Sequence, residues 1–128
     1  MKISCIARTL VLSACLAAAG AAQAAAPAQT ANTDKGQALV GPKGMTLYTF
    51  DKDADGKSNC NDKCAANWPP LAAGADAKAE GDWSIVTRDD GSRQWAYKGK
   101  PLYTWVKDAK AGDAGGDGVG GVWHLATP

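Results

Sequence analysis

The chain contains one short phrase twice, and this repetition constrains its fold more than any other feature. Residues 44–53 read GMTLYTFDKD and residues 99–108 read GKPLYTWVKD, an offset of 55 positions. Without a gap, the same offset aligns residues 35–73 with residues 90–128. The identical pairs are Gly36/Gly91, Lys43/Lys98, Gly44/Gly99, Leu47/Leu102, Tyr48/Tyr103, Thr49/Thr104, Lys52/Lys107, Asp53/Asp108, Ala54/Ala109, Asp62/Asp117 and Trp68/Trp123. A fixed internal period indicates a duplicated structural unit.

Each copy carries a tyrosine, an aromatic residue two positions later and an aspartate three positions after that. These residues are Tyr48, Phe50 and Asp53 in the first copy, and Tyr103, Trp105 and Asp108 in the second. With the segment CAANWPP at 64–70, this Y-x-[FWY]-x-x-D phrase resembles the secreted-repeat family of bacterial predicted lipoproteins, over nearly the whole chain after residue 34. The resemblance implies an exported tandem-repeat protein and no established activity.

The first 24 residues have the layout of a secretory signal. Lys2 and Arg8 supply a positive start, an apolar stretch follows, and AQA at 22–24 is a small-residue cleavage site. We therefore expect a signal peptide over residues 1–24. Lipidation is the alternative, because LSAC at 12–15 has the form of a lipobox that makes Cys15 the first residue of the mature chain. The apolar stretch continues well past Cys15, which favours cleavage after Ala24.

Cleavage after residue 24 leaves one small domain of 104 residues, enough for a single modest core. Residues 25–34 are expected to be a flexible leader, because they are mostly small and polar. A single β domain then spans residues 35–128. Removing Lys2 and Arg8 from the 14 basic residues leaves 12 against 13 acidic ones, a net charge of −1 without any basic run. The expected partners therefore do not include nucleic acid.

Short runs of β-branched and aromatic residues, separated by Gly, Pro and Asp, predict a mainly β fold. The expected strands cover residues 37–40, 45–50, 83–87, 93–97, 101–106 and 121–126. The turn sequences GPKG and RDDGS place a hairpin in each copy. One helical turn is expected after the cysteine loop, at 63–68, and is ended by Pro69 and Pro70. We predict a small antiparallel sandwich or barrel built from two closely paired repeats.

The repeated strand has two apolar faces. Because side chains alternate along a strand, Leu47 and Thr49 lie on one face and Tyr48 and Phe50 lie on the other, with the same division in the second copy. Neither face is polar, so the strand is expected to be covered on both sides. One side is a core, and the other is an aromatic layer that includes Trp68 and Trp123.

The domain after the signal has two cysteines, Cys60 and Cys64, whose equivalents in the second copy are Gly115 and Val119. Export places the pair in an oxidising compartment, so a disulfide is the leading interpretation. The alternative is a copper site, in which His124 adds an imidazole to two thiolates. The C-x3-C spacing does not fit attached haem, and three ligands are too few for a structural zinc site.

An acidic loop follows the first repeated strand. Asp51, Asp53, Asp55, Asn59 and Asp62 match positions 1, 3, 5, 9 and 12 of a calcium-binding loop. Against calcium, a strand instead of a helix precedes the loop, and Asp replaces the usual Glu at the last position. The sequence favours the alternative, a turn whose Asp and Asn side chains bond to its own backbone.

The repeated aspartates, Asp53 and Asp108, also have two interpretations. A pair of carboxylates can act as a general acid and a general base in catalysis. An aspartate just after a strand also caps the turn by accepting backbone N–H groups. Their repetition at identical positions favours the structural role.

Three classes of function follow. The favoured one is an exported, non-enzymatic module, periplasmic, secreted or lipid-anchored through Cys15, that presents an aromatic surface to a small ligand or an envelope protein. It needs no cofactor. The second is a metal-binding or redox accessory protein that uses copper or calcium. The third, a hydrolase that uses Asp53 and Asp108, is the least favoured, because no catalytic set assembles around the single histidine.

Overall fold

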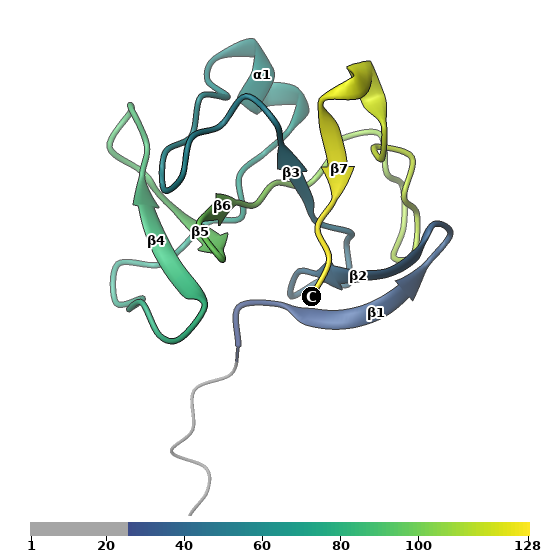
Figure 1. Cartoon of the computed structure of the whole chain (residues 1–128), viewed down its shortest axis with the longest axis horizontal. Coiled ribbons are helices and arrows are strands. Elements are labelled where there is room, and N and C mark those ends of the chain that lie inside the picture. The colour runs from purple at the N-terminus through teal and green to yellow at the C-terminus, as the bar shows by residue number, and fades with distance from the viewer. Residues whose placement is uncertain (1–25) are drawn as a thin grey trace, which may run out of the picture.

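The computed structural model describes residues 26–128, which form a mainly β domain (Figure 1). Its elements are β1 (Gln29–Thr33), β2 (Gly36–Val40), β3 (Tyr48–Phe50), α1 (Lys63–Asn67), β4 (Trp83–Thr87), β5 (Arg93–Tyr97), β6 (Lys100–Pro101), the 3-10 turn η2 (Val119–Gly121) and β7 (Trp123–Leu125). None of the helices in this part is long and apolar enough to cross a membrane. The predicted signal at 1–24 and Cys15 lie outside the described residues.

The strands form three small antiparallel sheets, with the orders β1–β2, β3–β7 and β4–β5–β6. The hairpin β4–β5 has the bounds expected from the sequence, and it places Trp83 opposite Tyr97. Tyr48 and Tyr103, the equivalent tyrosines of the two repeats, form a bridge in which each N–H donates to the other's carbonyl, at 2.8 and 3.0 Å. Because the two hydrogen bonds are reciprocal, the two repeated strands are related by a local twofold axis at this bridge. The predicted fold, mainly antiparallel β built from two repeats with one short helix, is confirmed.

The segment predicted as a flexible leader over 25–34 is largely a strand. β1 pairs with β2 along its whole length, from Gln29 opposite Val40 to Thr33 opposite Gly36. The prediction was wrong because it rested on composition, whereas the order comes from backbone hydrogen bonds that β2 supplies. The β1–β2 hairpin holds the place in the first repeat that β4–β5 holds in the second.

The two repeats exchange their last segments. The Ala126 N–H donates to the Leu47 carbonyl at 2.9 Å, and the Leu71 N–H donates to the Leu102 carbonyl at 2.9 Å. Leu71 and Ala126 occupy equivalent positions, as do Leu47 and Leu102. The end of each repeat therefore pairs with the repeated strand of the other repeat, as β7 does with β3 in Figure 1.

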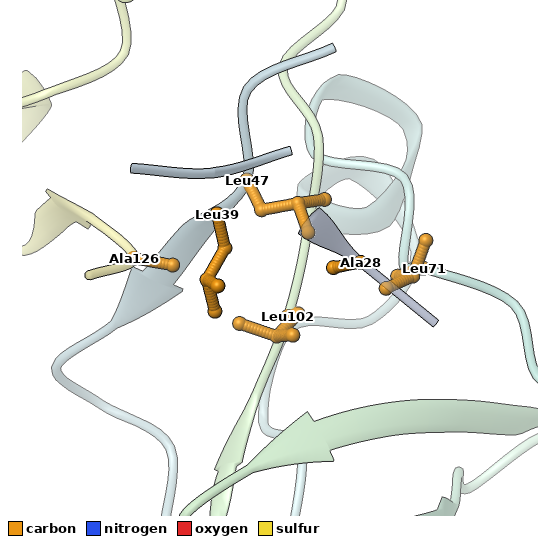
Figure 2. Close-up of a cluster of buried hydrophobic side chains, with 6 residues drawn as sticks. All are labelled: Ala28, Leu39, Leu47, Leu71, Leu102 and Ala126. Carbon is orange, nitrogen blue, oxygen red and sulfur yellow. The ribbon is translucent and has the colours of Figure 1, made fainter. Parts of the chain in front are cut away.

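Two apolar clusters lie on the two faces of the repeated strand, as the alternation predicted. The first contains Ala28, Leu39, Leu47, Leu71, Leu102 and Ala126 (Figure 2). The second contains Tyr48, Cys60, Trp68, Tyr103 and Trp123. Leu47 and Tyr48 are adjacent in sequence and both are fully buried, so the strand is covered on both sides.

A repeated glycine begins each repeated phrase for a conformational reason. Gly44 and Gly99 have φ of +79° and +83°, a region that residues with a Cβ rarely adopt. A Cβ on Gly99 would also overlap the Asp55 carboxylate. This identity between the copies therefore follows from the turn geometry.

The cysteine loop contains the expected helical turn. Helix α1 ends where the Trp68 N–H donates to the Cys64 carbonyl at 2.8 Å, just before Pro69. Cys60 and Cys64 form a disulfide. Both predictions are confirmed.

The exchange of segments predicts that neither repeat folds alone. In a fragment of residues 26–80, Leu71 would lose the Leu102 carbonyl and Tyr48 would lose Tyr103. We expect the whole chain to unfold in one transition, with equal calorimetric and van't Hoff enthalpies, and the fragment to show no sharp thermal transition. A cooperative melt of the isolated fragment would contradict this expectation.

Candidate functional site

The repeated tyrosines and aspartates form hydrogen bonds between the two repeats. The Tyr48 hydroxyl donates to Asp108 Oδ2 at 2.5 Å, and the Tyr103 hydroxyl donates to Asp53 Oδ2 at 2.7 Å. The sequence suggested neither bond, because each tyrosine lies five positions from the aspartate of its own repeat. The structure pairs it instead with the aspartate of the other repeat.

The second oxygen of each aspartate holds the loop of its own repeat. Asp53 Oδ1 accepts the Asn59 N–H at 2.7 Å, and Asp108 Oδ1 accepts the Gly115 N–H at 3.1 Å. This is the hydrogen bond that the capping interpretation predicted. Both oxygens of both carboxylates are thus engaged by donors, which opposes an acid and base role for the pair.

Burial determines the protonation of these groups. It raises the pKa of Tyr48 and Tyr103 well above the usual range, and the hydrogen bonds to the carboxylates raise it further. Both phenols therefore keep their protons and act as donors. Burial also raises the pKa of Asp53, while the Asn59 N–H and the Tyr103 hydroxyl partly oppose this rise.

Beside these bonds, four aromatic rings form a continuous stack in the order Phe50, Trp123, Trp68 and Trp105. Successive ring centroids are 4.2, 3.8 and 5.2 Å apart, with interplanar angles of 14°, 3° and 17°. The central pair, Trp68 and Trp123, is the repeated tryptophan, and the two ends are the repeated Phe50 and Trp105 positions. The expected aromatic layer therefore exists, but its centre is buried and serves as core.

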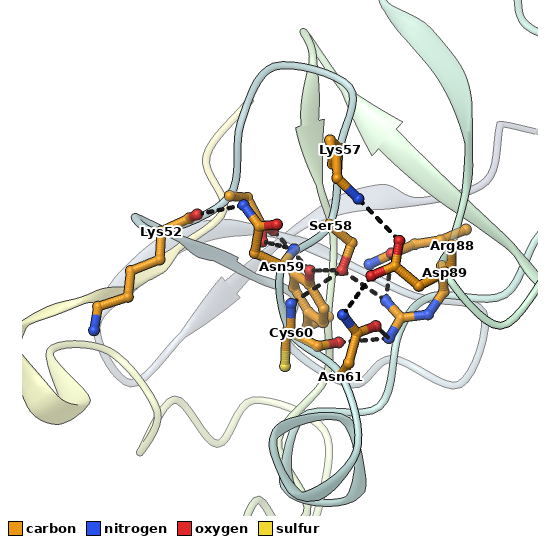
Figure 3. A network of polar contacts seen from close by, with 11 residues as sticks. Lys52, Lys57, Ser58, Asn59, Cys60, Asn61, Arg88 and Asp89 are labelled. Carbon is orange, nitrogen blue, oxygen red and sulfur yellow. Dashed lines mark hydrogen bonds and ion pairs between the residues drawn. The ribbon is translucent and has the colours of Figure 1, made fainter.

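A buried arginine that the sequence did not single out braces the cysteine loop (Figure 3). Arg88 donates to Ser58 Oγ at 2.8 Å and to the Cys60 carbonyl at 2.5 Å. Ser58 Oγ lies 2.6 Å from the Tyr103 hydroxyl, which donates to Asp53. The chain of contacts joins a buried positive charge to the Asp53 carboxylate, and nothing in the sequence around Arg88 indicates this long-range role.

The residues of the predicted calcium loop do not converge. Asp51 bonds to His124, whose Nε2 lies 2.6 Å from Asp51 Oδ2, whereas Asp53 points to Asn59 and Tyr103. The Asn59 side chain donates to the Lys52 carbonyl at 2.8 Å. These bonds between side chains and nearby backbone are those of the alternative, the self-bonded turn.

The first two aspartates of that loop, with Asp55, do line a polar cleft of about 470 Å³. Two ammonium groups share its lining, those of Lys98 and Lys100. Positive charges in the same lining oppose the binding of a divalent cation.

The copper alternative loses its thiolates, because Cys60 and Cys64 are joined in a disulfide. His124, the third expected ligand, is exposed and paired with Asp51. Within residues 26–128, no three His, Cys, Asp or Glu side chains gather closely enough to hold a metal ion.

A second cleft, here called the aromatic cleft, has a volume of about 670 Å³, within the range of small-molecule sites. Its lining includes Trp83, Trp95 and Tyr97 of the hairpin β4–β5, together with Asp76, Glu80 and Asp82. The three rings pack with one side against the first apolar cluster and are only partly buried. These aromatics were not singled out from the sequence, although the alternation of Trp95 and Tyr97 along one strand was visible.

The engaged aspartates predict a clear mutational pattern. Asp108→Ala leaves the Gly115 N–H and the Tyr48 hydroxyl without an acceptor, and Asp53→Ala removes the acceptor of the Asn59 N–H and the carboxylate partner of Tyr103. Each should lower the free energy of unfolding by about 1 to 3 kcal/mol. Asp→Asn keeps one acceptor oxygen, and both asparagine variants should melt near the wild type. Asp55→Ala is the matched control, because no donor among residues 26–128 bonds to that exposed side chain. Alanine variants that melt with the wild type would instead indicate a functional pair held at a cost to the fold.

The raised pKa of Asp53 predicts a pH dependence. Since its folded value lies above the unfolded value of 3.8, the stability from this group is fully present below pH 3.8 and is lost as the pH rises through the folded pKa. Asparagine does not titrate, so the melting temperature of Asp53→Asn minus that of the wild type should increase over this window.

Asp89→Asn should give the opposite sign in the same thermal melts. Lys57 lowers the pKa of Asp89, so this contribution is present above the usual pKa and is lost as the pH falls through the folded one. The same trend in both variants would mean that neither group controls it.

Comparison with known proteins gives one result. A family model described as a secreted repeat of unknown function matches the chain twice, at residues 29–72 and 84–127. No curated protein and no solved structure matches the chain. The two matches lie 55 positions apart, which is the offset of the internal repeat. Because they cover well over half of the chain, this protein belongs to the family of secreted repeats of unknown function.

Proposed function

We propose that this protein is an exported, non-enzymatic binding module of the periplasm or cell envelope, and that its ligand site is the aromatic cleft. The observation that carries the proposal is the set of three partly exposed rings, Trp83, Trp95 and Tyr97, that line a cleft of ligand size. Aromatic rings with a few polar groups around them are the usual lining of a small-molecule site.

The alternatives have less support. In the catalytic alternative, Asp53 and Asp108 would need free oxygens, and both carboxylates are fully engaged by N–H and O–H donors. In the metal alternative, the cysteines would need to be thiolates, and they form a disulfide. The proposed module therefore works without a cofactor. Stoichiometric copper or calcium in protein purified from the periplasm would contradict this part of the proposal.

The proposal predicts binding that depends on the rings of β4–β5. The purified protein is titrated with three probes of different chemistry, a neutral disaccharide, choline and an aromatic tripeptide, and binding is followed by calorimetry. At least one probe should bind, and Trp95→Leu should weaken it about fivefold or more while keeping an apolar contact with the core.

Val106→Ala is the control for this experiment, because Val106 is the exposed large apolar residue outside the cleft, at 51% exposure. Its affinity should equal that of the wild type. Equal weakening by both variants, or no binding of any probe to the folded wild type, would overturn the assignment of the aromatic cleft.

A further inference from the structure

The arrangement of the three rings in the aromatic cleft restricts the ligands that fit it. Trp83 and Tyr97 are directly opposite each other across β4–β5, and Trp95 is two positions from Tyr97 on the same face. The planes of Trp83 and Trp95 are inclined at 83°, with centroids 6.1 Å apart, and those of Trp83 and Tyr97 at 49°, with centroids 4.8 Å apart. Coplanar rings would form a flat platform, whereas inclined rings present faces and edges from several directions.

The charge around the rings has one dominant sign. Asp76, Glu80 and Asp82 line the cleft, and no salt bridge within residues 26–128 involves any of them. Lys78 is the one basic residue in the lining that the structure describes. The lining thus has a net charge of −2 when all four groups are ionised. An anionic ligand is disfavoured, and a cation gains from both the carboxylates and the rings.

The equivalent hairpin of the first repeat lacks these rings. The first repeat builds the equivalent hairpin, β1–β2, with Ala28, Val40 and Pro42 at the positions of Trp83, Trp95 and Tyr97. Ala28 and Val40 are buried, so small side chains are sufficient to cover the core there. The three rings of the second repeat also pack against this core, but they are only partly buried, so part of each ring remains exposed.

We propose that the aromatic cleft binds an organic cation, specifically a quaternary ammonium group, by cation–π contact with Trp83, Trp95 and Tyr97 and by attraction to the acidic rim. This inference rests on the proposed function and names its ligand class. Inclined aromatic rings beside unpaired carboxylates are the chemistry that recognises a cation with no hydrogen to donate. Lys98, outside the lining, places its Nζ 5.2 Å from the centroid of Tyr97, so this ring already faces one ammonium, and that positive charge partly offsets the negative charge of the rim.

The test compares choline with its uncharged analogue, in which a carbon atom replaces the nitrogen. Both have the same shape, so their difference in affinity measures the charge alone. Calorimetry on the full exported chain should find choline bound about tenfold more tightly than the analogue. Added salt should lower the affinity for choline more than the affinity for the analogue, because salt screens the carboxylates on the exposed rim.

Two sets of variants separate the rings from the rim. The double variant Glu80→Gln with Asp82→Asn removes two exposed charges without changing the core. It should lower the affinity for choline about fivefold and leave the affinity for the analogue unchanged. Trp95→Leu should weaken both ligands. The control is Asp89→Asn with Asp90→Asn, which changes the net charge by the same amount outside the cleft and should leave choline binding unchanged.

The outcomes distinguish this inference from the proposed function. Equal affinity for choline and the analogue, or tighter binding of a disaccharide than of choline, would contradict the inference of a cationic ligand. The proposed function as a binding module would still hold. If Asp89→Asn with Asp90→Asn weakened choline binding as much as the rim variants do, the effect would come from overall charge. That result would also overturn the inference of a cation site. A folded protein that binds none of the probes would overturn both.

Discussion

The structure depends on two hydrogen bonds, one buried and one partly buried, in which each repeat supplies the acceptor for the other's tyrosine. Tyr48 needs Asp108, and Tyr103 needs Asp53. A buried phenol without an acceptor costs about 1 to 3 kcal/mol, so a single repeat would carry an unsatisfied group at the centre of its main strand. Each carboxylate also holds a loop of its own repeat, so one side chain connects loop and partner strand. Duplication is therefore a condition of this fold.

Local pattern predicted the parts of the fold that depend on local physics. Alternation along the repeated strand placed Leu47 and Tyr48 on opposite faces, because side-chain direction in a strand follows from the backbone alone. Turn sequences located the hairpin at 83–97, since Asp and Gly there determine the turn conformation. The Cys60–Cys64 disulfide could be predicted because the two cysteines are four positions apart, so the bond does not depend on distant parts of the chain.

The sequence could not predict contacts whose partners are chosen by tertiary packing. Tyr48 and Asp53 lie close enough in sequence to imply a shared local site, yet the exchange of segments turns each to the opposite repeat. Arg88 stands at the end of an ordinary hairpin strand, and only the folded chain brings it to Ser58 and the Cys60 carbonyl. The prediction of a flexible leader at 25–34 was wrong for the same reason, because β1 is ordered by its hydrogen bonds to β2.

Differences between the two copies are more informative about function than their identities. Turns explain the shared glycines at 44 and 99, the exchanged hydrogen bonds explain the shared tyrosines and aspartates, and stacking in the core explains the shared tryptophans. The first copy alone has the disulfide loop, and Arg88 of the second copy donates to it through Ser58 Oγ and the Cys60 carbonyl. The second copy alone has three large rings on its hairpin, Trp83, Trp95 and Tyr97, where the first copy manages with small residues. The proposed ligand would account for this difference, because partly exposed rings and acidic side chains without an ion-pair partner among residues 26–128 line one cleft.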